Sequence, residues 1–222
     1  MKKALLTLLS IGLALTLINA QGKGSGNGNG YGNGNGGNGN RGGNNKSYDS
    51  NNTQTTTLTQ QQKDDLLYMY EEEKLARDVY ITLGEKWDSK VFLNIQKSEQ
   101  THMDSVKSLL IKYSLPIPEV KSGVVIPVDE DLNIYIPYSK NNIGVFKNQK
   151  LQALYYELIK KGTLSLKDAL EVGVLVEETD IADLEEKIEG VPEDIENVYN
   201  KLLKGSYNHL DAFNKNLEKL SK

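Results

Sequence analysis

The residues of this chain best suited to chemistry are its two histidines, His102 and His209. Each falls on the apolar stripe of a predicted helix, where a lone imidazole is more often satisfied by a core hydrogen bond than by a metal ion. Glu99, however, precedes His102 by three residues, and this Glu-x-x-His spacing places a carboxylate and an imidazole side by side on one helix face. Because an unpaired buried carboxylate is costly, Glu99 should have a cationic or metal partner, or be protonated.

Another predicted helix contains the acidic run Glu71-Glu72-Glu73. Glu73 falls on the apolar face of this helix and is the expected ligand, with Glu72 as the alternative on a flanking face. Glu71 is expected to be solvated, as part of an acidic run neutralised by Lys74 and Arg77.

A further predicted helix carries Glu177 in line with its apolar residues, and Asp180 adjoins it one turn on. Each of the four long predicted helices thus directs at least one potential ligand toward the same interior. Charged core positions are rare, so this coincidence favours a metal site over separate structural roles. The chain has no cysteine, which excludes thiolate zinc sites and iron–sulfur clusters, so the metal must be held by oxygen and imidazole ligands.

These side chains must be positioned by helices, and apolar residues recur at helical spacing in four long segments. The first begins after Thr59, which forms a capping-box pattern with Gln62, and runs to about Gly84. The second is capped by Asp88 or Ser89. Because the connection between them is short, these two helices should be antiparallel neighbours.

A long crossover is expected over residues 114–147, which contain four prolines and two β-leaning runs. A shorter amphipathic segment follows at 151–161. The third long helix is predicted over 165–190, and the last begins at Pro192, with Gly205 as a candidate kink. Two helix pairs joined by one long crossover, between helices two and three, is the connectivity of an all-α, ferritin-like four-helix bundle.

The chain divides into three regions by composition. Residues 1–20 combine two lysines, an apolar stretch and a final alanine, which predicts a signal peptide. Residues 21–57 hold 12 of the chain's 20 glycines and 10 asparagines, so they cannot form a core. They are expected to be a flexible spacer, with a wall- or matrix-binding tail as the alternative. Residues 58–222 suffice for one folded domain.

Charge and targeting restrict the partners. Residues 58–222 contain 21 basic and 29 acidic side chains, a formal charge of −8, so nucleic acid is not an expected partner. The signal peptide predicts an exported protein, secreted or in the periplasm or at the cell surface, that leaves the membrane once the peptide is cleaved. An uncleaved membrane anchor is the alternative.

Over nearly all of residues 58–222 the sequence resembles ferritin-like proteins, specifically the exported bacterial and archaeal branch called domain of unknown function 2202. Four stretches carry the resemblance: residues 71–80, 98–103, 169–184 and 205–210. In dinuclear members of the superfamily, two helices each give one glutamate and two each give Glu-x-x-His. The resemblance therefore implies these ligands: Glu73, Glu99, His102, Glu177 and His209.

The last helix departs from this pattern, because Ser206 occupies the place of the second Glu-x-x-His glutamate. A neutral hydroxyl is a poor substitute for a bridging carboxylate. Asp180 could compensate from one turn beyond Glu177 and complete a set of six ligands. Otherwise the site is expected to be mononuclear or asymmetric.

The resemblance implies two iron ions, with manganese or zinc as alternatives, and a di-iron oxidoreductase that oxidises ferrous iron or reduces oxygen or peroxide. Without cysteine the chain has no rubredoxin-like electron relay, so an external electron donor is expected. The alternatives are a bundle that sequesters metal without turnover and a structural or interaction bundle in which the Gly/Asn-rich tail is the working part. Whether the bundle forms a homodimer stays open.

Overall fold

The structure is a computed structural model that describes residues 57–120 and 142–221. Within these two ranges every regular element is an α-helix and no strand is present. The helices are α2 (Gln60–Trp87), α3 (Lys90–Lys112), α4 (Gln149–Gly162), α5 (Leu166–Lys187) and α6 (Glu193–Leu220). None of these described helices is long and apolar enough to cross a membrane.

The predicted all-α class is confirmed for the described residues, and all four long helices and the shorter amphipathic one are present. Three predictions lie outside the described residues. They are the signal peptide, the spacer as far as residue 56, and the β-leaning runs of the crossover.

Local capping signals begin the helices close to the predicted positions. The Thr59 hydroxyl accepts a hydrogen bond from the Gln62 backbone N–H at 3.2 Å, and the Gln62 side chain accepts one from the Thr59 N–H at 3.0 Å. This reciprocal pair is the predicted capping box. The Ser165 hydroxyl likewise accepts from the Asp168 N–H at 3.0 Å at the start of α5. These caps satisfy N–H groups that the first helical turn leaves unpaired.

Two glycines that were predicted to end or bend helices instead lie inside them. Helix α2 continues past Gly84 and ends where Asp88 adopts a left-handed conformation with φ 45°. A Cβ atom on Gly84 would lie 3.0 Å from the Cβ of Phe92, so this glycine allows α3 to approach α2 closely. Helix α6 runs without interruption through Gly205, where a kink was predicted.

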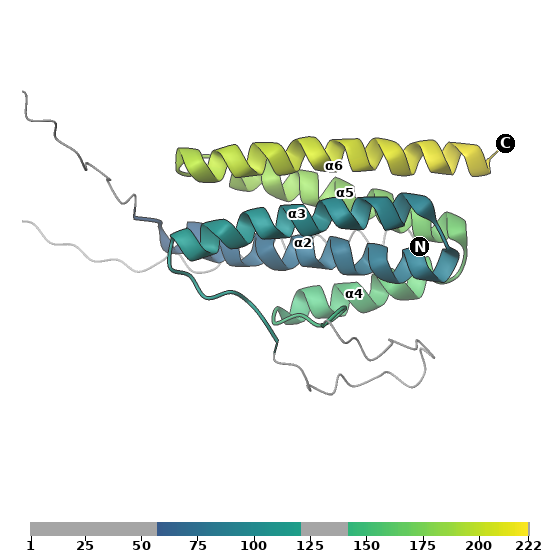
Figure 1. Cartoon of the computed structure of the whole chain (residues 1–222), viewed down its shortest axis with the longest axis horizontal. Coiled ribbons are helices and arrows are strands. Elements are labelled where there is room, and N and C mark those ends of the chain that lie inside the picture. The colour runs from purple at the N-terminus through teal and green to yellow at the C-terminus, as the bar shows by residue number, and fades with distance from the viewer. Residues whose placement is uncertain (1–56, 121–141, 222) are drawn as a thin grey trace, which may run out of the picture. The chain divides into compact units, whose positions relative to one another are not determined.

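The helices pack as a bundle with one shared interior. Figure 1 shows α2 beside α3, α5 beside α6, and α4 on the side of α2 that faces away from α6. Helix α2 also packs against α5, and α3 against α6. Helices α2 and α3 run antiparallel, because Arg77 contacts Gln100 while Gly84, further along α2, contacts Phe92 near the start of α3. The interior is therefore reached by side chains from α2, α3, α5 and α6.

Apolar clusters occupy this interior on both sides of a polar middle. On one side the rings of Tyr80, Phe92 and Phe213 pack with centroids 5.0–5.8 Å apart. On the other side an apolar cluster includes Leu66, from α2, and Val106, from α3, each fully buried. Along each helix the charged interior positions fall between these two clusters, which keep water away from them.

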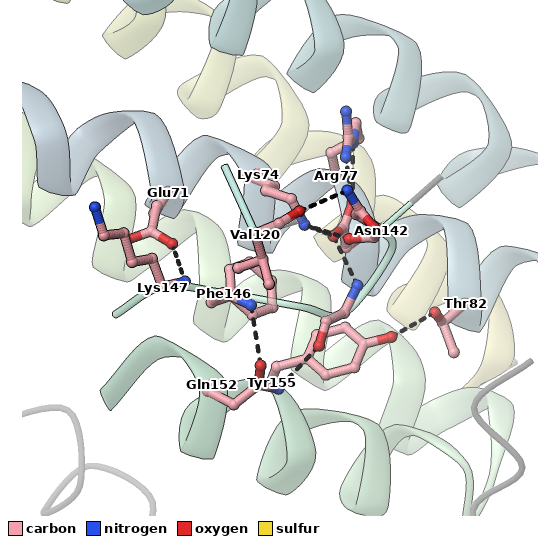
Figure 2. Close-up of polar contacts among 12 residues, drawn as sticks. Glu71, Lys74, Arg77, Thr82, Val120, Asn142, Phe146, Lys147, Gln152 and Tyr155 are labelled. Carbon is pink, nitrogen blue, oxygen red and sulfur yellow. Dashed lines mark hydrogen bonds and ion pairs between the residues drawn. The ribbon is translucent and has the colours of Figure 1, made fainter. Parts of the chain in front are cut away.

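The segment that returns to the bundle after residue 141 is held by buried charges of α2 (Figure 2). Glu71 is only 5% exposed, and its carboxylate accepts hydrogen bonds from the backbone N–H groups of Lys147 at 2.5 Å and Asn148 at 3.0 Å. The prediction of a solvated Glu71 is therefore wrong. The helical pattern of α2 alone does not show that a distant segment folds over this side chain and supplies donors.

Asp78 of α2 also binds the returning segment. Its carboxylate accepts from the Gly144 N–H at 2.8 Å and pairs with both Lys74 and Arg77. These two cations, expected from the sequence to neutralise Glu71, thus have Asp78 as their ion-pair partner, and Asp78 is fully buried. Removing one member of such a group leaves uncompensated buried charge.

Replacing Asp78 by Asn should lower the free energy of unfolding by about 3–5 kcal/mol, because Lys74 and Arg77 would lose their carboxylate in a buried setting. Urea denaturation at constant ionic strength measures this. The matched control is Asp211→Asn, since Asp211 pairs with Lys215 at positions that are 59% and 64% exposed. This control should change stability by no more than about 0.5 kcal/mol. Similar losses in both variants would contradict the role assigned to Asp78.

Candidate metal centre

Glu99 of α3 lies between the two histidines in the shared interior and is 2% exposed. Its Oε2 atom is 2.9 Å from Nδ1 of His102, one turn further along the same helix. Its Oε1 atom is 2.8 Å from Nδ1 of His209, which comes from α6. The two imidazole rings are 5.5 Å apart between centroids and inclined by 29°. Both histidines therefore present the same type of nitrogen to one carboxylate.

Two further carboxylates complete the arrangement from opposite sides. Glu73 of α2 places Oε2 3.3 Å from Nδ1 of His102, and Glu177 of α5 places Oε1 3.5 Å from Nδ1 of His209. Two groups of three potential ligands result, and Glu99 belongs to both. Within each group the ligand atoms lie within 4.8 Å of one another. Five of the six residues predicted as ligands are thus brought together, from four helices.

Asp180, the sixth predicted residue, belongs to neither group of three. It is 5% exposed and lies beside the centre, because its charge interacts with those of Glu73 and Glu177. Ser206 of α6 is fully buried and donates a hydrogen bond to Asp180 Oδ2 at 2.6 Å. The serine that replaces the expected glutamate therefore contacts the very carboxylate that was predicted to compensate for it.

Glu72, the alternative to Glu73, lies away from the histidines. It is buried, at 5% exposure, and its neighbours are Tyr68, whose hydroxyl lies 3.5 Å from Oε1, and Asp183. The geometry thus favours Glu73 over Glu72 as the residue of this run that faces the centre.

Several buried atoms of the centre lack a hydrogen-bond partner among the described residues. They are Glu73 Oε1, Glu99 Oε1, His102 Nδ1, His209 Nδ1 and Asp180 Oδ1. The short approaches at the two nitrogens are ion-pair contacts without the direction that a hydrogen bond requires. Buried polar atoms are rarely left in this way, and grouped carboxylate and imidazole atoms suit a cation.

The charges of the centre explain its protonation. Burial disfavours a charged Glu99, but the two imidazoles outweigh burial and lower the pKa of Glu99 to about 2. Burial likewise disfavours charged imidazoles, yet their carboxylate neighbours raise the pKa of His102 to about 11 and that of His209 to about 10. Burial raises the pKa of Glu73 to about 7 and that of Glu177 to about 8. Protons therefore balance the charge in the metal-free protein, and a metal ion would have to displace them.

Two residues outside the ligand groups position the candidate ligands. The Tyr80 hydroxyl donates to Glu177 Oε1 at 2.6 Å, which fixes one carboxylate oxygen. Gly205 leaves room for an imidazole, since a Cβ atom there would lie 2.4 Å from Nε2 of His102. This role of Gly205 was not among the sequence-based predictions. A signal was present, because Gly205 lies four residues before His209 and so shares its helix face.

Comparison with known proteins places the helical part in a defined group of relatives. A model of the uncharacterized protein domain family DUF2202 matches residues 62–135 and 125–222. Uncharacterized protein MJ0754 of Methanocaldococcus jannaschii is 49% identical over 153 residues, which are 68% of this chain and 72% of that protein. A crystal structure of hypothetical protein MJ0754 from Methanococcus jannaschii DSM 2661 matches with a TM-score of 0.64 and 44% identity. That match covers 74% of this chain and 84% of the other.

Replacing Gly205 by Ala should displace the His102 imidazole and weaken cobalt binding by about 10- to 100-fold, the usual effect of disturbing residues that support metal ligands. Titration followed by visible absorption measures this. Alanine favours a helix interior by about 1 kcal/mol over glycine, so loss of helix is not the expected cause. The matched control is Gly162→Ala, whose Cβ would lie 2.6 Å from the Leu83 side chain, in the apolar core. Unchanged cobalt affinity in Gly205→Ala would contradict the supporting role.

Proposed function

This chain belongs to the DUF2202 family, and we propose that it is an exported, ferritin-like protein that binds two metal ions, with iron as the expected metal, for oxidative chemistry. The proposal rests on one observation. Three carboxylates and both histidines of the chain converge from four helices on one buried volume, and several of their atoms lack hydrogen-bond partners.

The fold we propose is the ferritin-like four-helix bundle. Its first antiparallel pair is α2 and α3, and its second is α5 and α6, where contacts of Gly173 with Phe213 and of Asp180 with Ser206 show opposite directions. A long connection that contains α4 joins the pairs. The packing of α2 on α5 and of α3 on α6 supports this arrangement. In such bundles metal ligands project inward from facing helices.

The two groups of three potential ligands suggest two metal positions. One position would be held by Glu73 and His102, the other by Glu177 and His209, and Glu99 would be shared between them. Imidazole and carboxylate ligands suit iron, manganese and zinc. Together with Asp180, the three glutamates carry four negative charges when ionised, which two divalent cations balance while both imidazoles stay neutral.

We assign Asp180 as the sixth ligand, with Ser206 as the residue that positions it. The hydrogen bond from Ser206 occupies Oδ2, so Oδ1 is the oxygen that stays available. This arrangement moves one carboxylate from the last helix to α5. It predicts an asymmetric pair of positions, because Asp180 adjoins Glu177 on the same helix.

Two iron ions held by these residues would supply oxidation of ferrous iron or reduction of oxygen or peroxide. The residues of the chain orient the ligands and exclude water. Tyr80 holds Glu177 in place through its hydroxyl, and its ring packs with Phe92 and Phe213 over one side of the centre. Because the chain has no cysteine, an external donor would have to supply electrons. Export is proposed from residues 1–20 alone, which have the pattern of a signal peptide.

Anaerobic loading with ferrous iron should give about two bound irons per chain, as expected for a dinuclear bundle site. His102→Ala and His209→Ala should each lose iron, because each removes an imidazole from one position. Bound iron is measured by colorimetric assay after gel filtration, and oxygen and peroxide consumption by electrode. Tyr207→Phe is the control, since Tyr207 is 49% exposed on the same helix as His209.

The outcomes separate the hypotheses. Two bound irons with consumption of oxygen or peroxide support the oxidative role. Two bound irons without consumption favour metal sequestration. A wild-type protein that binds no more iron than the double histidine variant contradicts the proposed centre.

Metal binding at pH 7 should release protons. The pKa values of His102 and His209 lie above 7, so both imidazoles carry a proton in the metal-free protein and must lose it to bind a metal ion. The apparent affinity should therefore rise as the pH is raised toward about 10, the pKa of His209. Calorimetry in buffers of different ionisation enthalpy counts the protons. Binding without proton release would show that the metal lies elsewhere.

A further inference from the structure

A cavity of about 460 Å³ lies where α2, α3 and the returning segment meet, and none of its described lining residues belongs to the ligand groups of the candidate centre. The lining comes from three parts of the chain: Arg77 and Ile81 of α2, Gln96, Lys97 and Gln100 of α3, and Ile143 of the returning segment. Cavities of roughly 300–1,000 Å³ accommodate small organic molecules. The cavity is therefore large enough for a ligand of this kind.

The charged residues of this lining, Arg77 and Lys97, are both cations, although residues 58–222 carry more acidic than basic side chains. Asp78, the ion-pair partner of Arg77, is shared with Lys74, so it does not neutralise both cations. Lys97 is exposed and forms no ion pair with any other described residue. The half-buried Gln96 side chain likewise forms no hydrogen bond within the described part of the chain. The charge of the lining thus favours an anion over a cation.

Arg77 is held in place and still has unused donors. Its Nε and Nη2 atoms donate to Asp78 Oδ1 at 2.9 and 2.7 Å, and its Nη1 atom donates to Gln100 Oε1 at 2.6 Å. A guanidinium group has five N–H donors, so two remain after these three hydrogen bonds. Because the side chain is 12% exposed and already fixed, it loses little conformational freedom when it binds an anion. A carboxylate suits such donors, since its oxygens accept charge-assisted hydrogen bonds from guanidinium N–H groups.

Apolar side chains form another part of the lining. Ile81 lies one turn after Arg77 on α2, Ile143 belongs to the returning segment, and both are half-buried. A hydrocarbon group that packs against them would be removed from water, which stabilises binding. Inorganic anions have no such group. A ligand that uses both parts of the lining has a carboxylate joined to a short apolar body.

We propose that this cavity binds a small organic carboxylate, whose carboxylate group contacts Arg77 and Lys97 while its apolar body packs against the two isoleucines. Arg77 also pairs with Asp78, which binds the returning segment, so the ligand lies beside this attachment. The site requires no metal ion and is independent of the proposed oxidative function.

The test is calorimetric titration of the metal-free full chain with 4-methylpentanoate, a carboxylate with a branched apolar end. The wild type should bind it with a Kd of about 1 mM, as expected for a ligand of this size. The neutral amide of the same acid and inorganic phosphate should each bind at least about 10-fold more weakly, because each lacks one of the two recognised groups.

Two variants assign the binding to the cavity. Arg77→Lys should weaken binding by about 10-fold or more, since a lysine can still pair with Asp78 but lacks the planar donors of a guanidinium group. Lys97→Glu should weaken it by about 5- to 10-fold, because it reverses an exposed charge beside the cavity. The matched control is Lys201→Glu, which changes the net charge equally at an exposed position of α6 outside the lining. This control should bind as the wild type does.

Failure of the wild type to bind 4-methylpentanoate would overturn the site. Equal binding of the amide, or tighter binding of phosphate, would overturn the proposed ligand class. If Arg77→Lys does not fold, Lys97→Glu decides, and an affinity equal to that of Lys201→Glu overturns the assignment to this cavity. None of these outcomes bears on the metal centre, which iron loading tests separately.

Discussion

The structure depends on how a helical bundle compensates carboxylates that it buries. Two of them are compensated fully, since Glu71 accepts from backbone N–H groups and Asp78 pairs with two cations. The carboxylates around Glu99 are compensated by protons, by two imidazoles and by the Tyr80 hydroxyl, which donates to Glu177. The two groups differ in how completely their charges are paired. The first group has its partners in the chain, whereas the second has atoms without a hydrogen-bond partner among the described residues, which is why we propose a metal ion there.

Other features of the bundle stabilise the packing of the four helices around these incompletely paired charges. Burying charged side chains between the helices destabilises the fold, and the apolar clusters on either side offset this cost. They also exclude water, which keeps the local dielectric constant low. The low dielectric in turn strengthens the interaction of each carboxylate with its imidazole. Glycines act where two helices must come closer than side chains allow, as Gly84 does for Phe92 and Gly205 does for His102. The attachment of the returning segment by Glu71 and Asp78 keeps α2, which carries Glu73, in a fixed relation to α4.

Much of this could be predicted from the sequence because helical periodicity is a local property. It correctly indicated the long helices, the capping box at Thr59, and Glu73 rather than Glu72 as the residue facing His102. Features that depend on distant segments could not be predicted in the same way. Glu71 is buried by residues about 76 positions further along the chain. The space at Gly205 is meaningful only once His102 of another helix lies against it, and the pattern of α6 alone suggested a kink.

Ser206, which stands where the dinuclear pattern has a glutamate, connects α6 with a carboxylate of α5. A glutamate at this position would place its carboxylate on α6, whereas Ser206 instead holds Asp180 of α5 through its hydroxyl. The carboxylate is thereby moved onto the helix that also carries Asp183, three residues further on. A single line of carboxylates on α5 then runs from Glu177 to the partly exposed Lys187. On the proposed assignment, one carboxylate is moved from the last helix to α5, and the two metal positions differ because Glu177 and Asp180 come from the same helix.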